Sequence, residues 1–191
     1  MEEQNITKTK RGMLELILGS MYSGKSTELI RRATRCSIAN KNCIVIKSKM
    51  DDRYSSSEQI NTHDGRTYPS VICDKLMTLN GTFHNIDVIC IDEAQFFDDL
   101  VEFCLKMTEL GKRVIVAGLQ GDYHRHNFGH MSELMSYASK IDLLTAVCMI
   151  CGSDDATFSR RVIPNETNNL IRVGGKETYI AVCANCWKDS K

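Results

Sequence analysis

The chain has 191 residues, no formal net charge and a hydrophobic fraction of 42%, enough apolar material for one large domain or a domain with a small appendage. A neutral chain argues against a general affinity for nucleic acid or anionic membranes, because both favour a basic excess. The N-terminal segment lacks the apolar core of a secretory signal, and no apolar run approaches the ~18 residues of a membrane span. We therefore expect a cytoplasmic protein with no membrane and no nucleic-acid partner.

The predicted elements alternate between apolar strands and amphipathic helices after a tail at residues 1–12, which we expect to be flexible. Strands are predicted at 13–18, 43–47, 68–73, 87–92, 113–119 and 143–148, and helices at 26–39, 98–110 and 131–139. Continuously apolar strands that alternate with helices indicate a parallel sheet with helices on both faces. Residues 13–147 are therefore expected to form one α/β domain. Its polar segment 48–69 has a length that is typical of functional or disordered loops.

Residues 148–191 have a different pattern, which predicts a small zinc-ribbon-like domain. Two short strand-like pieces, 158–162 and 178–183, bracket a polar loop, and two Cys-x-x-Cys pairs flank it: Cys148 with Cys151, and Cys183 with Cys186. Four thiolates in two knuckles suit a closed tetrahedral zinc site, and a closed site makes the zinc structural. Four reduced thiols without a metal are the alternative. The other five cysteines are scattered singly, as expected of small buried side chains in a reducing compartment.

The segment Gly19-x-x-x-x-Gly24-Lys25-Ser26 matches the phosphate-loop pattern. Its glycines let the backbone wrap closely around phosphates, and the N-terminus of the following helix faces the anion. Lys25 is expected to reach the β- and γ-phosphates, and the Ser26 hydroxyl to bind Mg²⁺. A strand before the motif and a helix after it favour this interpretation over a chance glycine turn. The pattern therefore predicts ATP or GTP with Mg²⁺.

The apolar strand at 87–92 ends in two acids, Asp92 and Glu93. A phosphate loop needs a partner acid at the end of a neighbouring strand, and Asp92 is in the right place to face the Mg²⁺. Glu93 could then take a proton from an attacking hydroxyl or water as a general base. The alternative is that both acids are solvated, or that they cap the helix that begins near Asp98.

Several motifs beyond the phosphate loop resemble those of one family. They are GSMYSGKSTELIRR, DDRYSSS with THDG, IDEAQFF, VIVAGLQGDYHRHNFG, LTAVCMIC and GGKETYIAVCANC. In this order, over about residues 12–187, they resemble the cytosolic-type (type II) thymidine kinases. The resemblance implies transfer of the γ-phosphate of ATP to the 5′-hydroxyl of thymidine, and of deoxyuridine, in the salvage of DNA precursors. It also implies a homotetramer and feedback inhibition by thymidine triphosphate.

The resemblance also implies roles for individual residues. Glu93 matches the catalytic base, Asp92 the acid at Mg²⁺, and Arg53 a lid arginine that acts with Lys25 on the transferring phosphoryl group. The implied ATP site is Gly19, Ser20, Met21, Tyr22, Ser23, Gly24, Lys25, Ser26, Thr27, Asp51, Asp52, Arg53, Asp92, Glu93, Ala94 and Gln95. The implied nucleoside site is Met21, Phe96, Leu119, Tyr123, Phe128, Leu170, Ile171, Arg172, Val173, Gly174 and Tyr179. Within it, segment 170–174 matches a loop that binds the base through main-chain groups.

Two places depart from the family pattern. Ser20 stands where the family often has proline, and residues 119–123 read LQGDY where the family often reads LDGTF. Tyr123 adds a hydroxyl that needs a hydrogen-bond partner if it is buried. Three rival functions stay open: a phosphate-loop ATPase with no small-molecule acceptor, a zinc-ribbon nucleic-acid-binding module, and a deoxynucleoside kinase with broader base choice.

Overall fold

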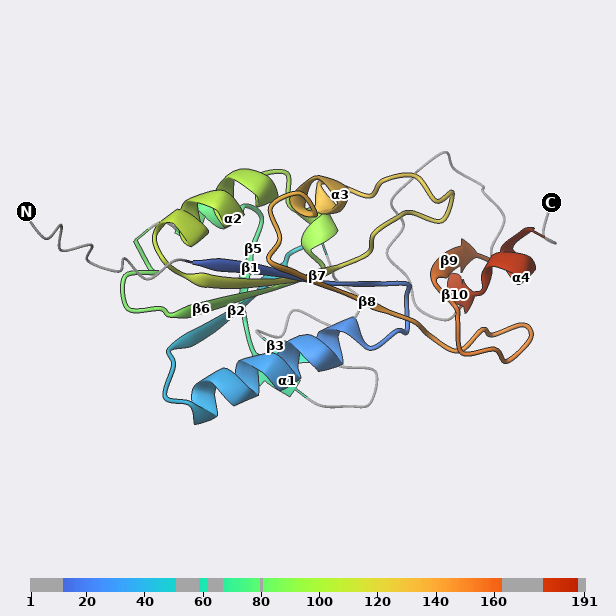
Figure 1. Ribbon diagram of the computed structural model, residues 1–191, viewed down its shortest axis with the longest axis horizontal. Helices are drawn as coiled ribbons and strands as arrows, with labels where there is room; N and C mark the ends of the chain where they lie inside the picture. Colours follow the sequence, from blue (N-terminus) through green and yellow to red (C-terminus); the bar gives the residue numbers. More distant parts are fainter. Residues whose placement is uncertain (1–11, 51–58, 62–66, 80, 163–176, 189–191) are drawn as a thin grey trace, which may run out of the picture.

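The computed structural model describes residues 12–50, 59–61, 67–79, 81–162 and 177–188, and a six-stranded sheet forms its centre (Figure 1). The strands are β1 (Met13–Gly19), β2 (Cys43–Ser48), β5 (Val71–Cys73), β6 (Val88–Asp92), β7 (Arg113–Gly118) and β8 (Lys140–Leu144). Their order is β5-β2-β6-β7-β1-β8, and every neighbouring pair is parallel. The predicted parallel α/β sheet is confirmed.

Helices cover both faces of this sheet, as Figure 1 shows. Helix α1 (Lys25–Ile38) packs on one face, where it buries Leu29 and Ala33 against Ile17 and Ile115. On the other face lie α2 (Leu100–Glu109), α3 (Met131–Leu134), and the short 3₁₀ helices η1 (Leu76–Leu79) and η2 (Ala94–Phe96). Strands buried on both faces need apolar residues throughout, which explains their continuous apolar runs. Among the described helices, none has the length and apolarity needed to cross a membrane.

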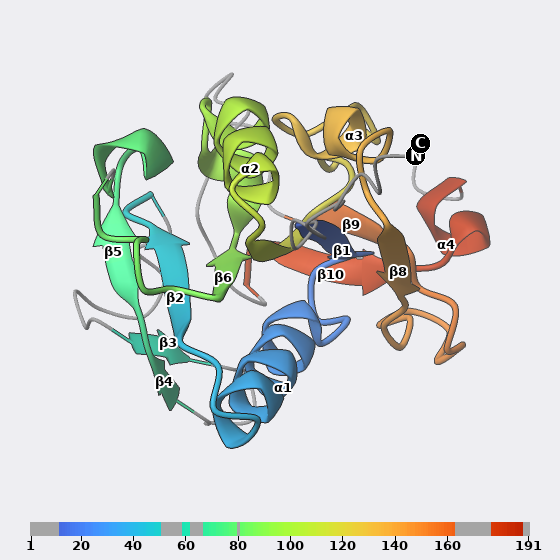
Figure 2. The same cartoon turned by 60° about the vertical axis from the view of Figure 1, so that its left-hand side comes forward.

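The C-terminal region forms a second, smaller layer beyond the carboxyl end of β1 (Figures 1 and 2). It contains the antiparallel pair β9 (Phe158–Arg161) and β10 (Tyr179–Val182), followed by α4 (Ala184–Lys188). Its own small core combines Ala146, Cys148 and Cys183 with half-buried aromatic side chains. This region therefore lies against the edge of the sheet from which the phosphate loop emerges.

Three predicted elements differ from the structure. The sixth strand was predicted at 143–148, but it is β8, Lys140–Leu144. β8 is an edge strand, and an edge strand tolerates polar residues such as Asp142, so the apolar run in the sequence begins after the strand has started. The helix predicted at 131–139 ends at Leu134 and continues as turns. The predicted strand 68–73 is split between β4 (Thr67–Pro69), which pairs with β3 (Gln59–Asn61), and β5.

Candidate active site

The turn between β1 and α1 has the shape of an anion site. Gly24 has a φ of 85°, in the left-handed region that favours glycine, and it offers no side chain to cap α1. A Cβ on Gly19 would lie 2.4 Å from Ser23 Oγ, so a side chain there would collide with the turn. The positive end of α1 therefore faces a turn that only a glycine-containing backbone forms, which is the arrangement that binds phosphate.

Lys25 begins α1, and its side chain folds back over this turn. Its Nζ donates a hydrogen bond to the carbonyl of Ser20 at 2.7 Å, and the residue is only 8% exposed. The half-buried Ser26 and Thr27 follow in the first turn of the helix. A buried ammonium beside the positive end of a helix attracts phosphate oxygens strongly.

The outer side of the phosphate loop is fastened to the C-terminal region. Three hydrogen bonds do this: Ser20 Oγ to the carbonyl of Ala156 (2.8 Å), the N–H of Met21 to Ser159 Oγ (2.9 Å), and Tyr22 Oη to the carbonyl of Tyr179 (3.2 Å). The first of them is a consequence of the serine at position 20, because proline has no hydroxyl to donate. The C-terminal region thus holds the loop in the shape that faces the anion.

The two acids lie at the same edge of the sheet as the phosphate loop. Asp92 is the buried last residue of β6, which is separated from β1 by β7 alone. Glu93 follows with φ 48° and ψ 43°, a conformation that is uncommon outside glycine and is often kept at functional sites. Across the sheet Asp92 pairs in register with the buried Lys47 of β2, which sequence reasoning missed. Lys47 could have been noticed in the sequence as a charged residue near the end of an apolar strand.

Gln95 connects Glu93 to the end of β7. Its Nε2 donates to Glu93 Oε2 at 2.6 Å, its Oε1 accepts the N–H of Leu119 at 3.1 Å, and the residue is 4% exposed. A Cβ on Gly118 would lie 2.8 Å from Gln95 Oε1, so the glycine leaves room for this bridge. Ala94, between Glu93 and Gln95 in the sequence, is fully buried in the core. Gln95 has the geometry of a residue that orients Glu93.

Aromatic side chains from three segments, η2, the segment after β7 and β10, meet in two pairs. Phe96 packs edge-to-face on Phe128, with ring centroids 5.6 Å apart, and Tyr123 lies 6.3 Å from Tyr179. Flat apolar surfaces of this kind suit a nucleobase. The structure therefore brings four residues of the predicted nucleoside site together in two pairs.

Part of the predicted site lies outside the described residues. This is true of Asp51, Asp52 and Arg53 in the lid, and of segment 170–174, which was predicted to cover the base. The lid segment 48–69 and the flexible tail at 1–12 are described only in part. The roles of these residues stay predictions.

The four paired cysteines come together in the C-terminal region. Their Sγ atoms all lie within 4.8 Å of one another, and those of Cys151 and Cys183 are 3.8 Å apart. Four sulfurs bound tetrahedrally to one zinc at ~2.3 Å would be about 3.8 Å apart, so the spacing fits this metal. The backbone N–H of Cys151 lowers the pKa of Cys148 to about 6, and that of Cys186 lowers the pKa of Cys183. Because thiolates bind zinc, these amides favour the form that the metal needs at Cys148 and Cys183, whereas hydrogen bonding with Cys151 raises the pKa of Cys186 to about 12.

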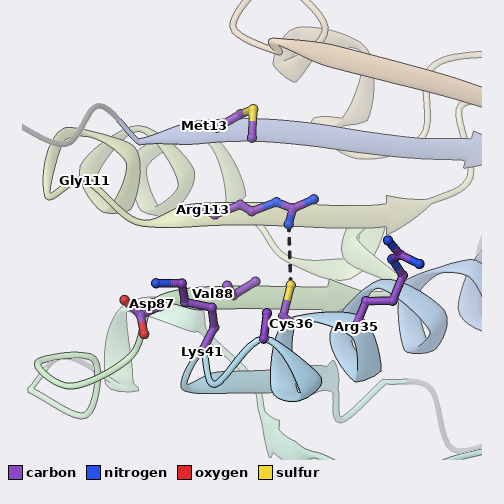
Figure 3. Close-up of a pocket in the computed structure, with 9 residues that line it drawn as sticks. Met13, Arg35, Cys36, Lys41, Asp87, Val88, Gly111 and Arg113 are labelled. Carbon is purple, nitrogen blue, oxygen red and sulfur yellow. Dashed lines mark hydrogen bonds between the residues drawn. The ribbon is translucent and has the colours of Figure 1, made fainter.

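Within the part of the chain that the structure describes, one pocket lies away from these groups and a smaller one lies beside the phosphate loop. A pocket of about 430 Å³ opens at the amino ends of the strands (Figure 3). Its lining is Met13, Arg35, Cys36, Ala39, Lys41, Asp87, Val88, Gly111 and Arg113. A smaller pocket of about 100 Å³ lies beside Ser20 of the phosphate loop and is also lined by Arg125. Because the phosphate loop and both acids are at the carboxyl ends of the strands, the larger pocket is not part of the candidate site.

Comparison with known proteins agrees with this geometry. The model of the thymidine kinase family matches residues 12–187. The chain belongs to this family. Curated relatives include thymidine kinase 1 of Dictyostelium discoideum, 40% identical over 94% of this chain and 79% of the relative. The thymidine kinases of Fowlpox virus (strain NVSL) and Yaba monkey tumor virus (strain VR587) are 43% and 44% identical, over 92% and 94% of this chain and 97% and 96% of their own. The predicted family is confirmed.

Proposed function

We propose that the chain transfers the γ-phosphate of ATP to the 5′-hydroxyl of thymidine, and of deoxyuridine, to give nucleoside monophosphates for DNA synthesis. The observation that carries this proposal is the arrangement at one edge of the sheet. The phosphate loop follows β1, Asp92 is the last residue of β6 with Glu93 directly after it, and the aromatic segment with Tyr123 and Phe128 follows β7. A phosphate donor, a proton acceptor and an apolar surface for a base thus meet where parallel strands end.

The phosphate loop would bind the donor. Its backbone N–H groups and the positive end of α1 would bind the phosphate oxygens, and Lys25 would neutralise charge on the β- and γ-phosphates. The Ser26 hydroxyl and the Asp92 carboxylate are oxygen donors of the kind that Mg²⁺ prefers, and they would hold this ion. Mg²⁺ would supply further charge neutralisation on the phosphates. Arg53 in the lid would add a cation at the transferring group.

Glu93 would act as the general base. Gln95 donates to its Oε2 and so orients the carboxylate, which would accept the proton from the 5′-hydroxyl. The oxygen of that hydroxyl then attacks the γ-phosphorus, and ADP leaves. Phosphoryl transfer depends mainly on positioning and charge neutralisation, so a base held in one orientation is worth more than a mobile one.

The nucleoside would lie against the aromatic residues. Phe96 and Phe128 supply one apolar pair, and Tyr123 and Tyr179 the other, and the buried Met21 would add a further apolar side chain. Main-chain groups of segment 170–174 would read the edge of the base. That readout would accept thymine and uracil, whose hydrogen-bonding edges are the same, and would reject the other bases.

The remaining features of the proposal are the domain organisation, the structural zinc, the cellular compartment and the oligomeric state. The C-terminal region from residue 148 would be a small domain with structural zinc on its four paired cysteines, joined to an α/β domain at 13–147. All nine cysteines are free, which agrees with a reducing cytoplasm. We further infer a homotetramer that is inhibited by thymidine triphosphate and needs no nucleic acid.

The test compares Glu93→Gln with Glu102→Gln, a control at an exposed glutamate of α2. Loss of a general base should lower kcat for thymidine by about 10² to 10⁴, while the Kd for Mg-ATP and the activity of the control variant stay unchanged. Normal turnover by Glu93→Gln would remove Glu93 from this role. A wild-type protein that forms no thymidine monophosphate would refute the function itself.

A further inference from the structure

Arg125 fastens the segment after β7 to the cysteine-bearing region. Its guanidinium carbon lies 4.0 Å from the centroid of the Trp187 ring and 5.1 Å from that of Phe158. Both distances are within the ~6 Å over which a cation is attracted to an aromatic face. Trp187 directly follows Cys186 in α4, and Phe158 begins β9. One side chain therefore contacts two elements of the C-terminal region.

The backbone around Arg125 is a fixed turn. Arg125 has a φ of 66°, and its N–H donates to the carbonyl of Asp122 at 3.0 Å. The buried carboxylate of Asp122 accepts two further N–H groups through its Oδ1, those of His124 at 2.8 Å and His126 at 2.9 Å. The N–H of Asp122 also donates to the carbonyl of His126 at 2.9 Å, so the turn is held by four hydrogen bonds and moves as a unit. A contact made by the Arg125 side chain therefore acts on the position of the whole turn.

The same turn carries two residues of the proposed nucleoside site. Tyr123 lies two positions before Arg125, and Phe128 three positions after it. Tyr123 reaches Tyr179 of β10, and Phe128 reaches Phe96 of η2. A shift of the turn would therefore displace both rings from their partners.

Trp187 in turn depends on the cysteine cluster. Its backbone N–H donates to the carbonyl of Cys183 at 3.0 Å, and its ring packs against the small core that contains Cys148 and Cys183. Helix α4 has only five residues, so it has little stability of its own. The position of the Trp187 ring therefore depends on how the two Cys-x-x-Cys pairs come together.

We propose that Arg125 is a positioning residue that couples the cysteine cluster to the nucleoside site. The closed cluster fixes Trp187, this ring together with Phe158 holds Arg125, and Arg125 keeps Tyr123 and Phe128 where the base would bind. The kinetic part of this inference rests on the proposed function, whereas the contact between Arg125 and Trp187 does not.

The chain offers a direct probe, because Trp187 is its single tryptophan. All experiments use the purified, zinc-loaded full chain. Arg125→Ala keeps a Cβ and therefore leaves the backbone preference of the turn nearly unchanged. His126→Ala is the matched control, because its imidazole is 78% exposed and belongs to the same turn. Acrylamide should quench Trp187 fluorescence more strongly in Arg125→Ala than in wild type or in His126→Ala.

The kinetic readout separates positioning from a general loss of structure. Arg125→Ala should raise KM for thymidine by about 5- to 30-fold, the equivalent of two exposed cation–π contacts, with kcat and KM for ATP changed less than about twofold. Arg125→Lys should recover part of this loss, because it keeps the cation. The double variant Arg125→Ala with Trp187→Leu should be no worse than the poorer single variant, since both remove one contact.

Three outcomes would overturn the proposal. The first is Trp187 quenching in Arg125→Ala equal to that of wild type, which would mean that the two side chains do not interact in solution. The second is an unchanged KM for thymidine, and the third is a fully additive double variant. If the wild type fails to phosphorylate thymidine, the proposed function fails, and quenching alone then decides whether Arg125 holds Trp187.

Discussion

Replacing Gln95 by leucine tests how the site orients its base. The change keeps a buried side chain of similar size, but it removes the donor to Glu93 Oε2 and the acceptor for the N–H of Leu119. Neither bond involves the phosphate loop. We therefore expect a lower kcat with an unchanged Kd for Mg-ATP.

The two hydrogen bonds of Gln95 set the size of the effect. A hydrogen bond to a charged group is worth about 1.5–3 kcal/mol, so loss of the bond to Glu93 should lower kcat by roughly 10- to 150-fold if that bond serves only to orient the carboxylate. The N–H of Leu119 is left without its acceptor at a cost of about 1–3 kcal/mol in the free energy of unfolding. For a chain of this size that cost corresponds to a Tm lower by roughly 2–12 °C.

The assay measures kcat for thymidine, the Kd for Mg-ATP and the Tm of Gln95→Leu. Gln120→Leu is the control, because the hydrogen bond of Gln120 Nε2 goes to the carbonyl of Thr157, at 2.9 Å, in the C-terminal region. The control should lose stability and keep its kcat. A Gln95→Leu variant with a lower Tm and a wild-type kcat would refute the orienting role and make Gln95 purely structural.

Three further predictions concern stability. Arg32→Leu should lower the free energy of unfolding by about 3–5 kcal/mol in urea titrations, because Arg32 forms an ion pair with the buried Glu15 at 2.8 Å. The control is a change in the exposed Arg31, which should cost less than about 1 kcal/mol. Equal losses in the two variants would contradict this prediction. Hydrogen bonding to Arg31 lowers the pKa of Glu28 to about 2, and Arg32 lowers that of Asp142. Both pKa values are lower in the folded protein than in the unfolded chain, so the stability that the two carboxylates contribute is complete above about pH 5 and is lost as the pH falls toward 2. A urea midpoint that stays constant over this pH range would contradict this prediction. Metal analysis should find one zinc per chain, and chelation should lower the Tm; a metal-free protein of unchanged Tm would favour bare thiols.

Local patterns were sufficient for the main features of the fold and site. Continuous apolar runs marked the strands of the parallel sheet, because those strands are buried on both faces. The phosphate loop and the pair of acids were recognisable because each follows directly from a strand. The spacing of the two cysteine pairs predicted a cluster, and the four sulfur atoms do come together.

What the sequence did not predict depends on contacts between distant residues. The start of β8 was missed because Asp142 is a charged residue on a strand, stabilised there by Arg32 of α1 at 2.6 Å. The bond from Ser20 to Ala156 spans 136 positions, and the bridge from Gln95 to Leu119 joins two strand ends. The two partners of such a contact lie too far apart in the sequence for any local pattern to contain both of them. The same is true of the contact between Arg125 and Trp187.

The central claim is that this chain phosphorylates thymidine, and one competition experiment tests it most directly. The purified protein is incubated with Mg-ATP and an equimolar mixture of thymidine, deoxyuridine, deoxycytidine, deoxyadenosine and deoxyguanosine, and the monophosphates are identified. The account predicts monophosphates of thymidine and deoxyuridine alone. Products from all five nucleosides would keep the chemistry and reject the specificity. Formation of ADP without any nucleoside monophosphate would contradict the account and leave a phosphate-loop ATPase.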